Sequence, residues 1–174
     1  MKSKSSNIFS FKCSCCGELH EGSPSFAFPA PTYVNQLPES EKDNIIESGE
    51  DLFKVKDGDN IHHFIRACLE VPILGCDEPF IWGIWVSLSA QNFNRYVTGW
   101  DDVDESDSYF GWFSSKLPYY DDTLSLKAQV RPRKNGIRPY LEIEQDGHEL
   151  ANDLNTYISI EKAQRIAEFC MHPK

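Results

Sequence analysis

The chain has 174 residues and a formal net charge of −10, and its composition is 40% hydrophobic and 13% aromatic. This composition suits one domain with a substantial core, and the negative charge argues against nucleic acid or an anionic membrane as the main partner, because phosphate groups need cationic neutralisation. No apolar stretch approaches the roughly 20 residues of a membrane span or forms a signal peptide after Met1, so we expect a cytoplasmic protein.

The N-terminal region predicts a short strand over residues 7–12 that leads into a cysteine-rich knuckle. Cys13 and Cys16 are separated by two residues and can face one ion, while the following Gly17 tolerates the positive φ that such a turn often needs. His20 is a plausible third ligand, and thiolate with imidazole favours zinc. The fourth ligand is open, and Cys15 could replace either of the other two cysteines. An unmetallated thiol pair and thiol redox chemistry are the alternatives, because reduced cysteines are expected in the cytoplasm.

The next segments combine an irregular region with a helix and two strands. Three prolines make residues 24–31 a stiff surface segment. Pro38, with two acids directly after it, predicts a helix that runs to about Ser48. Strands over 52–55 and 61–71 flank a turn at 56–60, and the odd-numbered side chains from Ile61 to Val71 form a mostly core-facing side.

The middle of the chain predicts a central strand followed by a helix. Residues 80–89 are apolar on both faces, and Trp82 and Trp85 point in opposite directions, which is typical of a strand buried on both sides. Ser89 can cap a helix over about 90–97. Residues 101–107 hold five acids and no base, which indicates a solvated loop or, alternatively, a site for a cation or a basic partner.

The C-terminal part predicts more strands and one helix, and it completes the expected fold class. Residues 109–113 and 124–131 are extended, residues 134–136 form a hairpin turn before a strand over 139–144, and Ser159 caps a final helix. We therefore expect an α+β fold with a mainly antiparallel sheet and a few flanking helices. Residues 1–8 are expected to be flexible and 9–172 to form a single globular domain, with the knuckle of 9–22 packed on it.

Two residues are candidates for general acid–base chemistry. His148 is flanked by acids and would need a second group to orient it, a role that Asp122 could fill, although no spacing brings the two together. A structural histidine in a loop is the simpler interpretation of His148.

Four further residues are candidates for binding. Arg66 lies in the middle of a strand, where it would form an ion pair with Asp122 or Glu70 or bind an anion. Arg138 precedes a proline, and it would likewise form an ion pair, bind an anion or be exposed. Trp85 and Tyr120 suit a ligand cleft or an interface, with core packing as the simpler alternative for the tryptophan.

Several of these motifs, in order, resemble one bacterial family, domain of unknown function 2199. The resemblance extends over nearly the whole chain, from about Phe9 to Cys170, although Phe53 stands where many members have Cys and Glu149 where Pro is usual. It implies no activity, because the family has none assigned. The motifs that carry it are Phe11-Lys12-Cys13-Ser14-Cys15-Cys16-Gly17 with His20, Phe64-Ile65-Arg66, Phe80-Ile81-Trp82-Gly83-Ile84-Trp85-Val86, Leu117-Pro118, Tyr120-Asp121-Asp122-Thr123-Leu124, Arg138-Pro139 and His148-Glu149-Leu150-Ala151.

The sequence contains no complete catalytic motif, and three functions are compatible with it. The preferred one is a cytoplasmic binding or interaction module with a structural zinc knuckle. Its partner is an unknown protein or small molecule, and a basic one if electrostatic attraction governs binding. The second is an immunity-type protein that neutralises a basic toxin through residues 101–107. The third is a metal-dependent hydrolase in which an open zinc site works with His148 or Glu18 as base.

Overall fold

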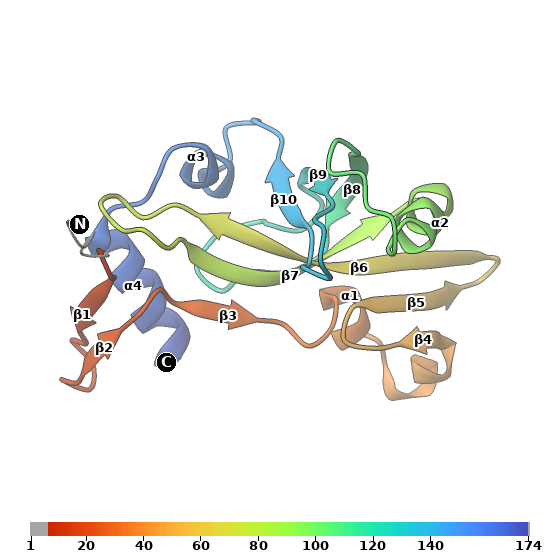
Figure 1. The fold of residues 1–174 in the computed structure, drawn as a ribbon. Coiled ribbons are helices and arrows are strands. Elements are labelled where there is room, and N and C mark those ends of the chain that lie inside the picture. The colour runs from red at the N-terminus through yellow and green to blue at the C-terminus, as the bar shows by residue number, and fades with distance from the viewer. Residues whose placement is uncertain (1–6, 174) are drawn as a thin grey trace.

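The computed structural model describes residues 7–173, so most of the segment expected to be flexible, 1–8, lies outside the described residues. A long antiparallel pair, β6 (Asn60–Val71) and β7 (Phe80–Leu88), runs through the centre of the molecule (Figure 1). Apolar side chains occupy both faces of β7, and Trp82 and Trp85 enter two different hydrophobic cores. The prediction of a central strand buried on both sides is confirmed.

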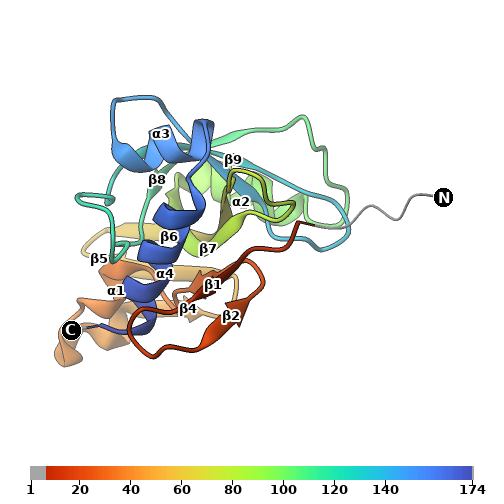
Figure 2. The same ribbon diagram turned by 90° about the vertical axis from the view of Figure 1, so that its left-hand side faces the viewer.

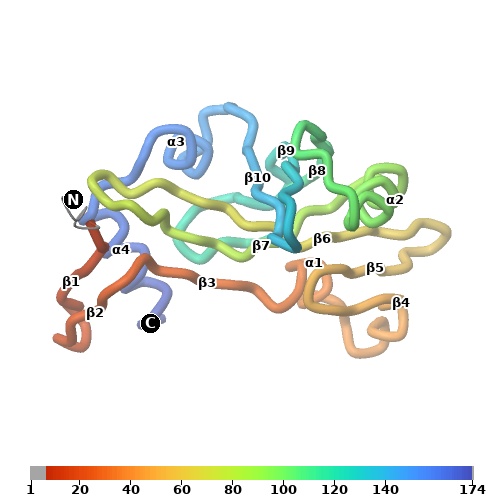
Figure 3. Tube along the Cα trace, in the orientation of Figure 1, coloured from red at the N-terminus to blue at the C-terminus, as the bar shows by residue number. Residues whose placement is uncertain are grey.

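Five strands close into a small barrel. β7 pairs with β8 (Tyr109–Phe113), which pairs with β9 (Lys127–Arg131), which pairs with β10 (Tyr140–Ile143), and β10 returns to β6. The tube in Figure 3 allows this path to be followed along the chain. The barrel encloses the larger core, which includes Ile65, Leu69, Ile84, Val86 and Val130. The sequence predicted a sheet but not its closure into a barrel, because the pairing of β10 with β6 leaves no local signal in the sequence.

Three strands extend the barrel sideways. β5 (Leu52–Asp57) pairs with the first half of β6 and carries β4 (Ile45–Ser48) at its outer edge, while β3 (Ser25–Ala27) pairs with β7. Within the described residues, the pairings of this eight-stranded sheet are antiparallel except for β3 with β7 and β10 with β6. The expectation of a mainly antiparallel sheet in a mixed fold is therefore confirmed.

A second, smaller core lies outside the barrel, under the added strands. It contains Phe53, Val55, Phe64 and Trp85, together with Val34 of the short helix α1 (Thr32–Asn35). On β6, Ile65, Ala67, Leu69 and Val71 face the main core, and Phe64 on the opposite face enters the second core. Of the side chains expected to face the main core, Ile61 is exposed at the free end of the hairpin.

Two predicted helices are confirmed, and one is wrong. Ser89 Oγ accepts the Asn92 N–H (3.1 Å) at the start of α2 (Ala90–Thr98), and Ser159 Oγ accepts the Lys162 N–H (3.1 Å) at the start of α4 (Ile160–Met171). The helix expected over 38–48 is instead a 3-10 helix, η1 (Glu39–Asn44), followed by β4. The 3-10 segment buries no side chain, and Ile45 directly after it pairs with Val55 of β5, so strand pairing outweighs the helix-start signal. A helix missing from the prediction, α3 (Glu149–Asn155), follows His148.

The N-terminal hairpin lies against the C-terminal helix. β1 (Ser10–Lys12) pairs with β2 (Leu19–Glu21), and Figure 2 shows this pair beside α4. Gln164 Nε2 on α4 donates to the Lys12 carbonyl (3.2 Å). The first and last segments of the described residues are thus brought together, which places the knuckle next to the last turn of α4. Within residues 7–173, no helix has the length and apolar character needed to cross a membrane.

Candidate metal centre

The turn between β1 and β2 positions three potential ligands. The Cys13 N–H donates to the Glu18 carbonyl (2.8 Å) and the Gly17 N–H to the Cys13 carbonyl (2.9 Å), while Gly17 adopts φ of 77°. A side chain at this φ is disfavoured, so glycine is the residue that permits the turn. Strand pairing then places His20 opposite Phe11, two residues before Cys13. As a result, the donor atoms of Cys13, Cys16 and His20 all lie within 4.8 Å of one another.

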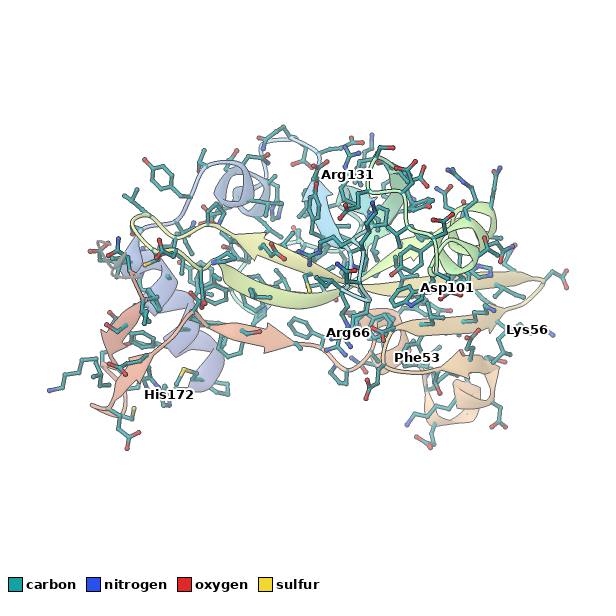
Figure 4. All side chains as sticks on the ribbon, in the orientation of Figure 1. Phe53, Lys56, Arg66, Asp101, Arg131 and His172 are labelled. Atoms are coloured by element: carbon teal, nitrogen blue, oxygen red, sulfur yellow. The ribbon has the colours of Figure 1, made fainter. Side chains whose placement is uncertain are left out.

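A second group of donors shares one member with the first. Cys13, Cys15 and His172 also have donor atoms within 4.8 Å of one another, and Cys13 Sγ lies 3.3 Å from His172 Nε2. In the first group, Cys16 Sγ lies 3.6 Å from His20 Nε2. Figure 4 shows His172 at the end of α4, beside the hairpin. Cys13 is therefore the common member of two overlapping sets of three donors.

The cysteines differ in exposure and in pKa. The Cys13 side chain is only 2% exposed, whereas Cys15 and Cys16 are exposed. Hydrogen bonds from the backbone of Cys16, and to a smaller extent Cys15, lower the pKa of Cys13 from 9.0 to about 7 despite partial desolvation. For Cys16, a hydrogen bond with the Glu18 backbone lowers the pKa of the thiol, but desolvation and the neighbouring Cys13 together outweigh it. The pKa of Cys16 is therefore raised above 9.0. Cys13 is thus readily available as a thiolate, the form that binds metal.

The chemistry of the donors fits a thiophilic ion. Residues 13, 16 and 20 of the first group and 172 of the second supply two thiols and two imidazoles, the same kinds of ligand as in Cys₂His₂ structural zinc sites. Mg²⁺ and Ca²⁺ prefer oxygen ligands, which this donor set does not supply. His172 is the member that sequence reasoning missed. It is 159 residues away from Cys13, and only a histidine directly after the final predicted helix could have suggested it.

Polar contacts independent of any metal hold the knuckle on α4. Glu168 accepts the Ser14 N–H at one carboxylate oxygen (2.6 Å) and the Ser14 hydroxyl at the other (2.9 Å). The bond from the Ser14 N–H, followed by one from Gln164, lowers the pKa of the Glu168 carboxyl. The cluster also borders an open groove of about 500 Å³, whose lining is Cys15, Tyr119, Arg165, Glu168, Phe169, His172 and Pro173.

His148 and Asp122 are not joined in the structure. His148 caps α3: its Nδ1 accepts the Leu150 N–H (3.1 Å), and its Nε2 lies 2.6 Å from the Asp121 carbonyl, to which it donates in this tautomer. Both ring nitrogens are therefore used by backbone groups. Among the described residues no hydrogen bond links His148 with the Asp122 side chain, which is exposed at a positive φ of 45°. The arrangement fits the structural alternative for His148.

The two candidate arginines lie where the outer edge of β6 changes partner. The Arg66 N–H bonds to Asp51 O before β5, and the Cys68 N–H bonds to Pro139 O before β10. The Arg66 guanidinium lies over the Trp85 ring, 5.9 Å from its centroid, and donates weakly to Glu50 O (3.3 Å). Arg66 is labelled in Figure 4. The suggested pairing of Arg66 with Glu70 is wrong, because Glu70 pairs with Arg133 (2.6 Å). Arg138 Nε bonds to Asp51 Oδ1 (2.6 Å), an ion pair at the surface.

The two aromatic candidates are buried. Trp85 is fully buried, and its Nε1–H donates to the Phe28 carbonyl (2.8 Å). Tyr120 is 3% exposed, and its hydroxyl donates to Asp153 Oδ2 (2.7 Å). These contacts fit the packing alternative for both side chains.

The acidic loop of residues 101–107 uses several of its charges locally. Asp107 faces Arg95 at 3.6 Å, Glu105 faces Lys134 at 3.9 Å, and Asp104 accepts from the backbone and hydroxyl of Ser106. Three of its five acids therefore have a partner within the chain.

Comparisons with known proteins place the chain in a family but give no close template. Searches of the curated proteins and of the solved structures found no significant match. A family described as uncharacterised and conserved in bacteria matches residues 12–158, which include Cys13 to His20 of the knuckle and the whole barrel but end before α4. The match covers most of the 174 residues, so the chain belongs to the DUF2199 family, as the sequence motifs indicated.

Proposed function

We propose that this protein is a binding or interaction module in which a structural zinc ion joins the N-terminal hairpin to the C-terminal helix. Cys13, Cys16, His20 and His172 would hold the ion. The observation that carries the proposal is the convergence of these donors from both ends of the described chain, with Cys13 Sγ 3.3 Å from His172 Nε2 and Cys16 Sγ 3.6 Å from His20 Nε2. When bound, zinc would supply a tetrahedral cross-link between the two ends.

The donor set supports a structural role over a hydrolytic one. Four protein ligands fill a tetrahedral site, and a hydrolase needs an open position for water. The alternative hydrolase also needs a base, and both nitrogens of His148 are engaged by backbone groups. Cys15 is the competitor for the fourth position, because its sulfur belongs to the second donor set.

The proposed binding partner is a protein or a small molecule, and the net charge of −10 favours a basic one. Neutralisation of a basic toxin in the cytoplasm is one form of this function. It is the less favoured form, because three acids of residues 101–107 already have partners within the chain. A toxin gene adjacent in the genome would support it.

Elemental analysis of the purified full-length protein tests the metal. About one zinc per chain is expected, with none in the Cys13→Ser/Cys16→Ser double variant. The matched control is Cys68→Ser, a half-buried thiol on β6 that is not part of the donor sets and should keep its zinc. Because the double variant could fail to fold, chelator treatment of the wild type provides a second measurement, and a lower melting temperature is expected. A wild-type protein that contains no zinc and melts unchanged with chelator would contradict the proposal.

A further inference from the structure

We propose that the three cysteines of the knuckle form an oxidation site, in which Cys15 reacts first and then forms a disulfide with Cys13 that releases the metal. This inference rests on the proposed zinc site. Four protein donors suffice for one ion, yet the two sets that overlap at Cys13 offer five, so one thiol is left over. The extra thiol is Cys15 when His172 completes the site.

The exposure of the sulfurs supports Cys15 as the first to react. Cys15 and Cys16 are exposed, whereas Cys13 is only 2% exposed. Cys16 would be bound to zinc, whose positive charge withdraws electron density from the sulfur and slows its attack on an oxidant. Cys15 also lines the open groove beside His172, through which a small oxidant can reach it. An accessible thiol next to a second cysteine is the usual arrangement at sites of reversible oxidation.

The geometry also identifies the partner in the disulfide. Cys13 Sγ lies within 4.8 Å of both the Cys15 and the Cys16 sulfur, whereas Cys15 and Cys16 do not occur together in a donor set of the described residues. Cys13 belongs to both donor sets. A Cys13–Cys15 disulfide therefore removes one donor from the first set and two from the second. Of the four proposed ligands it removes the thiolate that both sets share, so the ion should be held much more weakly and be lost to a competing chelator.

The oxidant that balances the chemistry is a peroxide. The Cys15 thiolate attacks hydrogen peroxide, an S–O bond forms, the O–O bond breaks and hydroxide leaves, which gives the sulfenic acid. The Cys13 thiolate then attacks the Cys15 sulfur, an S–S bond forms, the S–O bond breaks and a second hydroxide leaves. The two sulfurs lose two electrons in total, and the peroxide is reduced to two hydroxides, which take up two protons to become water.

Release of the metal would act on a defined part of the surface. His172 and Pro173 line the groove, and His172 would lose its tie to Cys13. The Ser14–Glu168 and Lys12–Gln164 hydrogen bonds do not involve a cysteine side chain, so the hairpin should stay docked on α4. Oxidation is thus expected to free the last residues of the described chain and to change one wall of the groove, without unfolding the domain.

The test treats the zinc-loaded, full-length protein with hydrogen peroxide. Zinc release is followed with a chromogenic chelator, and disulfides are mapped by peptide mass spectrometry without reduction. The wild type is expected to lose its zinc and to form the Cys13–Cys15 disulfide, and a thiol reductant with added zinc should restore the metal. Cys15→Ser should lose zinc severalfold more slowly, whereas the control Cys68→Ser should match the wild type.

Two results would overturn the inference and can be distinguished from failure of the metal proposal. One is equal release rates in the wild type and Cys15→Ser. The other is a disulfide map in which Cys13 stays reduced after zinc has left. Failure of the metal proposal is seen before peroxide is added, as untreated protein without zinc, and the disulfide map then still decides whether Cys13 and Cys15 pair.

Discussion

Cys13 Sγ and His172 Nε2 lie 3.3 Å apart, although 159 positions separate the two residues in the chain. The turn after β1 places the thiol, and the end of α4 places the imidazole. This contact joins a hairpin that has little core of its own to a helix that packs on the barrel. The contact adds to the burial of Phe9 and Phe11 in the main core and to the Ser14–Glu168 hydrogen bonds, which together hold the three-residue strands β1 and β2 in place.

Removing the distant ligand should weaken the metal site without abolishing it. In His172→Ala, three donors remain. Loss of a residue that only supports a metal ligand typically lowers the affinity ~10–100-fold, and loss of the ligand itself is expected to lower the zinc affinity by more than that. Competition with a chelator of known affinity measures the change. His62→Ala is the matched control, because His62 lies on β6 and contacts Asp57 rather than the cysteines. Equal affinity in the wild type and His172→Ala would assign the fourth position to Cys15 instead.

The Ser14–Glu168 contact should be needed to dock the hairpin even when metal is removed. Glu168→Ala deletes the acceptor of two bonds, so the backbone amides of residues 13–21 should exchange with solvent faster than in the wild type. The carboxyl has a lowered pKa, so its contribution to stability is present above its ordinary pKa of 4.5 and is lost as the pH falls through the lower, folded value. Hydrogen exchange of the metal-free protein measures this effect. Arg165→Ala, an exposed change on the same helix, should leave exchange unaltered.

The sequence predicted those elements whose signals are local. Ser89 and Ser159 cap their helices as expected, and the alternation and apolar faces of residues 61–71 and 80–89 identify the central strands. The helix expected over 38–48 was wrong because its start signal is local, whereas the pairing of Ile45 with Val55 on β5 depends on the folded sheet. Barrel closure through Tyr140 and Cys68 is a long-range pairing of the same kind.

The candidate site shows the same division between local and long-range information. Cys13, Cys16 and His20 lie within eight residues, so their spacing alone suggests a common ion. His172 can be found only once α4 is known to lie beside the hairpin. Tyr120 and Trp85 carry no signal that separates a recognition residue from a core residue, and burial decides the question only in the folded chain.

His148 should prove to be important for stability. His148→Ala removes the acceptor at the start of α3 and the contact with the Asp121 carbonyl, so it should lower the free energy of unfolding by ~0.5–2 kcal/mol. His148→Asn keeps a side-chain acceptor at the cap and should recover most of that loss. Urea unfolding of the three proteins measures both values. A general base would give the opposite pattern, with unchanged stability and loss of whatever turnover is found.

Tyr120 should make the domain sensitive to alkaline pH. Burial, followed by the hydrogen bond to Asp153, raises the pKa of its hydroxyl far above the ordinary value of 10.0. The pKa of the neighbouring Lys162 is also raised, above 10.5, because Asp153 and Glu149 stabilise its charge in spite of desolvation. An unfolded tyrosine ionises above pH 10 while the folded Tyr120 stays neutral, so stability falls as the pH rises through 10. The contribution of Lys162 is present below 10.5 and is lost as the pH rises through its higher, folded pKa.

Tyr120→Phe separates the tyrosine contribution from the others. At neutral pH the variant should be less stable by about 1 kcal/mol, because Asp153 loses a buried hydrogen-bond donor. Above pH 10 the difference should shrink, since phenylalanine does not ionise in either state. Melting curves from pH 8 to about 11 measure the change, with Tyr157→Phe as the control because Tyr157 is exposed. A constant gap between Tyr120→Phe and the wild type across this range would show that the hydroxyl ionises equally in both states, which its burial against a carboxylate does not allow.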